Sequence, residues 1–255
     1  MQLTADQLAQ FHRDGYLAFP EFLTPREVEE ARQALATLIR QYPRGRLLVQ
    51  FEPGVPTRDE LSVRKLMRFC EVNPFLDGLA HRHPKIRGVV ESILGADPIL
   101  FQDMALIKPP FIGSEKPWHQ DNAYFAVTPL ASVLGVWIAL DPATVANGCM
   151  HVLPGEHRHG PRKHHHTFDC EIMPGRINPK QAVPVELPAG GALVFAGMLP
   201  HQTPANRSPD RRRALQFHYR SAGSRVVSAE EYNRIYAEAD GTPASCAAAP
   251  KKKKE

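Results

Sequence analysis

Apolar residues recur at helical intervals in the first third of the chain. From Pro25 to about Gln41 they lie three or four positions apart, which predicts a long amphipathic helix with one buried face (Val28, Ala31, Leu35, Leu38 and Ile39). Thr24 offers an N-cap side chain directly before Pro25, whose fixed φ angle suits the first helical turn. The pattern therefore predicts where this helix begins as well as its buried face.

Two shorter helices and one strand are predicted in the same part of the chain. Thr4 and Gln7 have the spacing of a capping box, which indicates a helix that begins there and ends near residue 14. The apolar stretch Tyr16–Phe19 follows as a short strand. A further helix is expected over Pro84–Leu94, where a glycine directly after the last residue suits a left-handed C-cap.

From residue 99 onward, the pattern changes to short apolar runs separated by Pro, Gly, Asn and Asp. These runs cover residues 99–107, 133–140, 150–153, 192–195 and 214–219. Short runs at such intervals predict an antiparallel sandwich or jelly roll, so the fold class is mainly β with N-terminal helices. We expect one domain over residues 1–240, with a helical part of about 1–98 and a jelly-roll core of about 99–222. The low-complexity stretch 241–255 is expected to be a disordered tail.

The composition is that of a soluble globular protein, with 43% hydrophobic and 23% charged residues over 255 positions. The formal net charge is +4, but four lysines and one glutamate at 251–255 contribute three of these charges. Because the rest of the chain is close to neutral, no nucleic-acid partner is expected.

Neither a membrane partner nor a secretory signal is expected. No apolar stretch approaches the roughly 18 residues that span a bilayer, and the N-terminus is polar. The four cysteines form no C-x-x-C pair and are expected to be reduced thiols (Cys70, Cys149, Cys170 and Cys246). These features favour a cytoplasmic location.

The sequence Trp-His-Gln-Asp at 118–121 contains a candidate metal site. At the end of a strand, residues two positions apart point the same way, so His119 and Asp121 can converge on one cation. His201 is a candidate third ligand that a β-sandwich can bring from a distant segment. Two imidazoles and one carboxylate leave three open positions on an octahedral ion, as in non-haem Fe(II) oxygenases. Because an H-x-D pair also occurs by chance at protein surfaces, the prediction needs a second signal.

Arg212 supplies that second signal, because it follows His201 by eleven residues and is expected on the next strand. A guanidinium grips a carboxylate through two parallel hydrogen bonds. 2-Oxoglutarate, which chelates iron through its keto-acid end, needs such an anchor for its far carboxylate. Thr203 offers a hydroxyl donor beside the third ligand, and Arg211 or Arg213 could serve in place of Arg212.

These motifs together resemble the phytanoyl-CoA dioxygenase family. The resemblance extends from about Phe11 to Arg220 and includes DGYL at 14–17, WIALD at 137–141 and NGCMHVLPGEH at 147–157. It implies a double-stranded β-helix, a cupin-like jelly roll, that uses Fe(II), 2-oxoglutarate and O2. It also implies that His119, Asp121 and His201 are the iron ligands. The retained carboxylate of Asp121 disfavours halogenation, because halogenating relatives lack it.

The resemblance further implies which residues bind the co-substrate. Arg212 and Thr203 match the anchor of the distal carboxylate, and Trp137, Met104 and Lys65 match positions that line or support the same site. Substrate contacts are predicted on or beside the strands that carry the site (Gln102, Asn122, Tyr124, Phe125 and His151). The His-rich stretch 157–166 is interpreted as an exposed loop, because its spacing defines no second metal geometry.

The resemblance implies a dioxygenase, and hydroxylation of a small organic molecule with release of succinate and CO2 is the leading hypothesis. The same iron centre could instead perform desaturation, epimerisation or cyclisation, depending on how the substrate lies. The alternative from another class is a cupin-like metal-binding or isomerase domain. Such a domain would have no need of Arg212, Thr203 and Lys65 together, so the co-substrate anchor distinguishes the two hypotheses.

Overall fold

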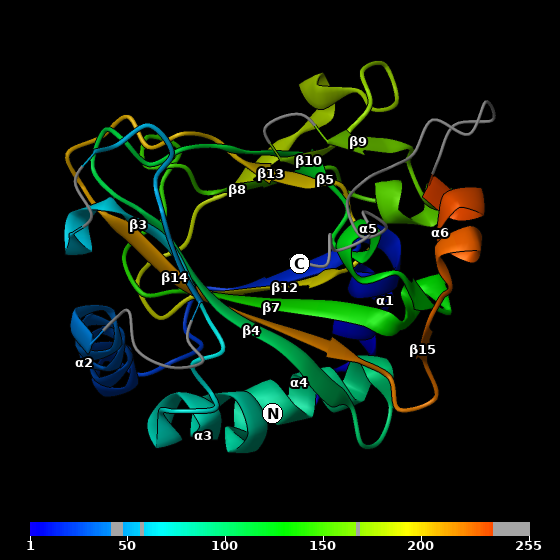
Figure 1. The fold of residues 1–255 in the computed structure, drawn as a ribbon. Coiled ribbons are helices and arrows are strands. Elements are labelled where there is room, and N and C mark those ends of the chain that lie inside the picture. The colour runs from blue at the N-terminus through cyan, green and yellow to red at the C-terminus, as the bar shows by residue number, and fades with distance from the viewer. Residues whose placement is uncertain (42–47, 57–58, 167–168, 237–255) are drawn as a thin grey trace, which may run out of the picture.

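Two antiparallel sheets face each other in the computed structural model, which describes residues 1–41, 48–56, 59–166 and 169–236 (Figure 1). The major sheet has the order β1 (Tyr16–Phe19), β12 (Ala192–Ala196), β7 (Val133–Ala139), β14 (Arg212–Arg220), β4 (Ile99–Lys108), β3 (Val63–Met67) and β2 (Leu48–Phe51). The minor sheet has the order β11 (Val183–Val185), β8 (Met150–Val152), β13 (His201–Thr203) and β5 (Lys116–His119). This arrangement confirms the predicted jelly roll.

Two small ribbons, six α-helices and four short 3-10 helices (Glu60–Ser62, Leu130–Ser132, Glu156–His159 and Pro179–Gln181) complete the described fold. The ribbons pair β9 (His164–His166) with β10 (Cys170–Ile172) and β6 (Val127–Thr128) with β15 (Arg225–Val226). The helices are α1 (Ala5–Asp14), α2 (Pro25–Gln41), α3 (Pro74–Arg82), α4 (Pro84–Leu94), α5 (Asn122–Phe125) and α6 (Ala229–Tyr236). Figure 1 shows α3 and α4 beneath the major sheet, on the side opposite the minor sheet. The three helices predicted from the sequence (α1, α2 and α4) are confirmed, and Thr4 and Gln7 form the expected capping box.

The N-terminal part is less purely helical than predicted. The strand β1 is present as expected, but β2 and β3 also come from the first 98 residues and extend the major sheet. The helix α3 was missed as well, although Asn73 and Pro74 carry a recognisable start signal. The Asn73 side chain accepts a hydrogen bond from the backbone N–H of Leu76, and Pro74 occupies the first turn.

The strand β14 separates the apolar core from the interior between the sheets. Leu215, Phe217 and Tyr219 point toward the helices, where the Phe217 ring packs 6.0 Å from the Phe69 ring. The Tyr219 hydroxyl donates to the carbonyl oxygen of Ala80 in α3 at 2.6 Å. The intervening side chains point the other way, so β14 presents a polar face to the space between the sheets.

Three further expectations concern the membrane, the tail and the cysteines. None of the helices in the described ranges is long and apolar enough to cross a membrane. The stretch 241–255, expected to be disordered, lies outside the described residues. Cys70 and Cys149 are free thiols, as expected, whereas Cys170 is disulfide-bonded, so the prediction of a reduced thiol is wrong there. Cys246 also lies outside the described residues.

Gly135 provides a test of how tightly the major sheet is packed. It pairs with Phe195 across β7 and β12, and a Cβ atom at Gly135 would lie 2.4 Å from Cζ of that ring. The ring cannot move freely, because it is fully buried and packs 4.8 Å from the ring of His201. We expect Gly135→Ala to lower the free energy of unfolding by about 1–3 kcal/mol in urea denaturation of metal-free protein.

Gly223→Ala is the matched control, because no heavy atom lies within 4 Å of the added Cβ position. Its unfolding free energy should stay within about 0.5 kcal/mol of the wild type. Equal losses in the two variants would show that the contact with Phe195 is not the cause.

Candidate active site

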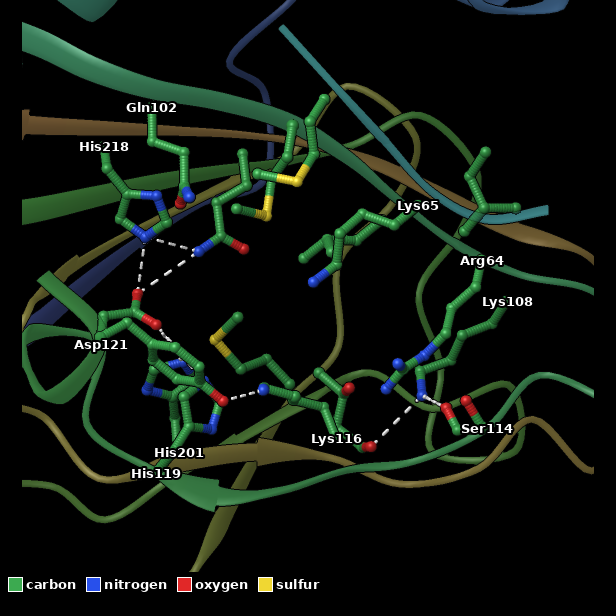
Figure 2. Close-up of a pocket in the computed structure, with 18 of the residues that line it drawn as sticks. Arg64, Lys65, Gln102, Lys108, Ser114, Lys116, His119, Asp121, His201 and His218 are labelled. Atoms are coloured by element: carbon green, nitrogen blue, oxygen red, sulfur yellow. Dashed lines mark hydrogen bonds and ion pairs between the residues drawn. The ribbon is translucent and has the colours of Figure 1, made fainter. Parts of the chain in front are cut away.

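Three potential metal ligands converge between the sheets (Figure 2). His119 ends β5 and lies directly opposite His201, the first residue of β13. Asp121 follows in the turn that leads into α5, with a helical backbone (φ −58°, ψ −37°). One ligand atom from each side chain lies within 4.8 Å of the other two. The residues predicted from the sequence are therefore brought together, by one strand pair and the turn that follows it.

Backbone carbonyls orient both imidazoles. Nδ1 of His119 lies 2.8 Å from the carbonyl oxygen of Pro117, and Nδ1 of His201 lies 2.9 Å from that of Leu199. A carbonyl oxygen only accepts, so each Nδ1–H donates and each Nε2 keeps its lone pair. Burial, followed by the charges of His201 and Lys116, lowers the pKa of His119 to about 3, so this imidazole is neutral.

The two carboxylate oxygens of Asp121 face different neighbours, and Oδ1 is the one that faces the two histidines. Its Oδ1 lies 3.3 Å from Nε2 of His119 and 3.6 Å from Nε2 of His201. Adjacent ligands of an octahedral ion with bonds of about 2.1 Å lie about 3 Å apart, so these distances fit a small divalent metal. The two neutral imidazoles and the carboxylate are also the donor set of non-haem Fe(II) sites.

The other oxygen of Asp121 is held by two residues that the sequence did not single out. Its Oδ2 lies 2.7 Å from Nε2 of His218 and 3.4 Å from Nε2 of Gln216. Burial alone would raise the pKa of Asp121, but His218 and His201 hold it well below its usual range. The carboxylate therefore carries no proton, and Nε2–H of His218 must donate. Counting every second residue of β14 from Arg212 would have found both partners.

A cavity of about 250 Å³ opens beside these three ligands. Seven of the other residues predicted for the site line it (Lys65, Gln102, Met104, Tyr124, Phe125, Thr203 and Arg212). Further cationic side chains that the sequence did not indicate join them (Arg64, Lys108 and Lys116). Both sheets contribute, since β3, β4 and β14 supply one wall and β5, β8 and β13 supply the other.

Arg212 is the guanidinium that faces this cavity, and its neighbours face elsewhere. Its side chain is only 1% exposed; within the described residues, Nη1 donates to the carbonyl oxygen of Leu106 at 3.3 Å and Nε has no partner. By contrast, Arg213 is held by Asp141 through two contacts of 2.8 Å, and Arg211 contacts Glu60. These pairings favour Arg212 over its two neighbours as the anion anchor.

Arg212 is a buried cation that an anionic ligand would stabilise. Burial lowers its pKa to about 10, and its guanidinium lies over the Trp137 ring at 5.4 Å. Trp137 is fully buried and does not line the cavity itself, but it supports the guanidinium from behind. An isolated buried cation is costly, so this site is suited to a carboxylate.

Two predicted substrate contacts do not line the cavity. The Asn122 side chain is fully buried and bonds both the N–H and the carbonyl oxygen of Val127, which stabilises the turn around α5. Nδ1 of His151 instead lies 3.2 Å from the carbonyl oxygen of Cys149, two residues before it and just outside β8. Both side chains have local structural roles, because tertiary packing turns them away from the interior.

The His-rich stretch is not simply an exposed loop. His164 is 2% exposed, and its Nε2 accepts the backbone N–H of Gln120 at 3.1 Å. The Gln120 side chain in turn donates to the carbonyl oxygens of Gly160 and Met198. Since Gln120 lies between two of the potential metal ligands, this loop supports the turn that positions them. Among the described residues, the His119, Asp121 and His201 group is the only cluster suited to a metal.

Comparison with known proteins agrees with this geometry. The model of the phytanoyl-CoA dioxygenase family matches residues 11–214. The chain belongs to this family. It is 29% identical to a phytanoyl-CoA dioxygenase of Arabidopsis thaliana over 85% of this chain and 88% of the relative. It is 26% identical to phytanoyl-CoA dioxygenase domain-containing protein 1 of Danio rerio, over 90% of this chain and 94% of the relative.

Solved structures of similar proteins share the fold. EvdO2 from Micromonospora carbonacea var. aurantiaca, complexed with 2-oxoglutarate, is 25% identical, with a TM-score of 0.68 over 89% of this chain and 94% of that one. EctD from S. alaskensis with bound Fe is 22% identical, with a TM-score of 0.74 over 89% of this chain and 79% of that one. Membership of the family makes the chain an enzyme and an oxygenase.

His218→Ala tests whether the support of Asp121 matters for metal binding. Without the imidazole, Oδ2 of Asp121 keeps only the longer contact to Gln216, and the carboxylate can rotate away from the site. Loss of such a supporting partner typically weakens metal affinity by about 10- to 100-fold. We expect a loss of this size for Fe(II) or Co(II), measured by competition with a chelator.

His81→Ala is the matched control, because His81 is 47% exposed on α3 and pairs with Asp77. Its metal affinity should equal that of the wild type. If His218→Ala also binds metal normally, the contact to Asp121 does not help to position the ligand.

Proposed function

We propose that this enzyme is an Fe(II)- and 2-oxoglutarate-dependent dioxygenase in which His119, Asp121 and His201 hold the metal. The observation that carries the proposal is a buried group of three ligands that shares one cavity with Arg212, a buried guanidinium that has no carboxylate partner within the described ranges. A metal-binding jelly roll without a co-substrate has no use for Arg212 in that position. Membership of the family gives independent support.

We assign the distal carboxylate of 2-oxoglutarate to Arg212 and Thr203. Thr203 is two residues beyond His201 on β13, so both side chains point into the cavity. Trp137 stacks behind the guanidinium, Met104 forms part of the apolar wall, and Lys65 adds a positive charge. A dianionic keto acid thus finds a metal at one end and cations at the other. EvdO2, a structural relative, has been crystallised with 2-oxoglutarate.

The protein's own contribution is to orient the reactants and to exclude water. Bound iron would supply the activation of O2, with 2-oxoglutarate oxidised to succinate and CO2 as the co-substrate. The carbonyls of Pro117 and Leu199 keep both imidazoles in the tautomer that binds metal, while His218 and Gln216 hold the carboxylate. A metal held by two imidazoles and one carboxylate would keep three positions open for the keto acid and O2. We propose hydroxylation of a small organic molecule as the outcome, as the resemblance to the family implies.

A visible absorption band tests the co-substrate assignment without any knowledge of the substrate. In the absence of oxygen, Fe(II) and 2-oxoglutarate together should produce a weak charge-transfer band, because the keto acid chelates iron through two positions. Fe(II) alone should not give the band, and neither should Fe(II) with succinate, which lacks the keto group. His201→Ala should lose it. Folded, metal-loaded wild type without a band at saturating 2-oxoglutarate would contradict the proposal.

Arg212→Ala should weaken 2-oxoglutarate and leave the metal in place. A charge-assisted hydrogen bond contributes roughly 1.5–3 kcal/mol, which corresponds to a loss of about 10- to 150-fold in affinity. The measurement is the concentration of 2-oxoglutarate that half-saturates the band. Arg213→Ala is the control, because Arg213 is paired with Asp141 away from the cavity. A loss in the control and none in Arg212→Ala would place the anchor elsewhere.

A further inference from the structure

The C-terminal helix α6 packs against α5, the short helix that follows Asp121 (Figure 1). The Tyr232 hydroxyl donates to the carbonyl oxygen of Ala123, two residues beyond Asp121, at 2.6 Å. Tyr232 is only 1% exposed, and Ala123 is fully buried. Just before α6, β15 pairs with β6, and the N–H of Val227 donates to the carbonyl oxygen of Ala126 at 2.7 Å. The C-terminal segment therefore contacts the turn that carries Asp121 at several successive positions.

The same helix contacts the segment that leads to His201. The Tyr236 hydroxyl lies 3.8 Å from Sδ of Met198, which is three residues before His201 and 4% exposed. Met198 also contacts the turn described above, because Nδ2 of Asn122 lies 3.8 Å from its Sδ and Nε2 of Gln120 donates to its carbonyl oxygen at 2.7 Å. α6 thus contacts Met198 at the point where the two segments that carry potential metal ligands meet.

A third contact joins α6 to the loop that supports Gln120. Nζ of Lys163 donates to the carbonyl oxygen of Ile235 at 3.3 Å, near the end of the helix, where a cation interacts favourably with the last carbonyl groups. The His164 ring, whose Nε2 accepts the N–H of Gln120, lies 5.7 Å from the Tyr236 ring. Three segments around the potential metal site are therefore in contact with one helix.

We propose that Tyr232 and Tyr236 are positioning residues for the metal, which act through the turn of Asp121 and the segment before His201. The inference rests on the proposed function, since it concerns the metal site of that enzyme. It assigns a role to a helix of which no described residue lines the cavity. Neither tyrosine would contact the metal or a reactant, so both would act only through the geometry of the ligands.

The turn that carries Asp121 depends on contacts from outside. α5 is only four residues long and begins without a side-chain cap, and β6 after it has two residues. Helices this short are not stable in isolation. Within the turn, the Asn122 amide bonds both backbone groups of Val127, and we infer that packed segments such as α6 supply the remaining support. Metal ligands must be held to within about 0.5 Å, so a loosened contact at Ala123 should displace the Asp121 carboxylate.

Coupling of this kind acts in both directions. If the docked helix favours the geometry that binds metal, bound metal must favour the docked helix by the same free energy. Local opening of α6 would then weaken the metal site, whereas local opening of a helix far from the site would not. A helix that only adds stability to the fold would show neither effect. Metal affinity and the opening of α6 are therefore the two quantities to measure.

Tyr232→Phe and Tyr219→Phe are a matched pair of variants. Both tyrosines are buried, and each hydroxyl donates to a backbone carbonyl oxygen at 2.6 Å, that of Ala123 for Tyr232 and that of Ala80 for Tyr219. Tyr219 points toward the helices beneath the major sheet, away from the potential metal ligands. We expect Tyr232→Phe to weaken Fe(II) or Co(II) by about 2- to 30-fold in competition with a chelator. Tyr219→Phe should bind metal like the wild type, although both variants should unfold more easily without metal.

Tyr236→Leu is a second variant, because it removes the ring beside His164 and the contact to Met198. Its metal affinity should fall by a similar factor. Asn233→Ala is the control on the same helix, since Asn233 is exposed. Its metal affinity should match that of the wild type.

Hydrogen exchange measures the opening of α6 in the wild-type protein. Fe(II) added without oxygen should slow the exchange of the α6 backbone amides by about twofold or more, well below the unfolding temperature. The amides of α3 are the control, because α3 lies beneath the major sheet, on the side opposite the minor sheet (Figure 1). Their exchange should not change.

Three results would overturn the inference. These are wild-type metal affinity in both Tyr232→Phe and Tyr236→Leu, an equal loss of metal affinity in Tyr219→Phe, or no slowing of exchange in α6 beyond that in α3. The visible band of Fe(II) with 2-oxoglutarate is recorded for the same wild-type protein. A missing band would refute the proposed function itself, whereas a normal band together with any of the three results would refute the role of α6 alone.

Discussion

The pairing of β5 with β13 is the contact on which the rest of the site depends. It places His119 opposite His201, and the carbonyls of the same two segments orient both rings. The register shifts along this pair, since Lys116 and His119 are three residues apart and face Thr203 and His201, which are two apart. A bulge of this kind aims Lys116 and His119 into the same cavity, which strict alternation would not do. The major sheet then fixes the pair from the other side, where Phe195 packs against His201 in the space left by Gly135.

Charge shapes the interior as strongly as packing does. Arg212 is almost completely buried and contacts no carboxylate among the described residues, whereas Arg211 and Arg213 on either side are paired with Glu60 and Asp141. A buried guanidinium without a counter-charge destabilises the folded protein. We therefore infer that an anionic ligand neutralises Arg212 when it binds. The metal ligands have the opposite charge balance. Two neutral imidazoles and one hydrogen-bonded carboxylate give this part of the cavity a negative charge, which favours a cation.

The sequence predicted the strongly periodic elements and the residues that carry chemistry in a motif. The helices α2 and α4 have the predicted bounds, and the long strands of the major sheet were anticipated to within a few residues. The strands β5 and β13 are only three or four residues long and contain Pro or His, so no periodicity could indicate them. Lys116 was missed for the same reason, since its place in the cavity depends on the bulge.

The positions of Gln216 and His218 in the site can be predicted from the alternation of side chains along β14, but only once Arg212 is known to point inward. Asn122 and His151 do not line the cavity, because their orientation is decided by a turn and by the pairing of β8.

Crystals grown without oxygen in the presence of Fe(II) and 2-oxoglutarate would test the central claim most directly. Anomalous scattering at the iron edge locates the metal independently of any assumption about its ligands. We expect one iron between Nε2 of His119, Nε2 of His201 and a carboxylate oxygen of Asp121, with the distal carboxylate of 2-oxoglutarate against Arg212. Iron at another position, or a co-substrate whose distal carboxylate lies away from Arg212, would contradict it.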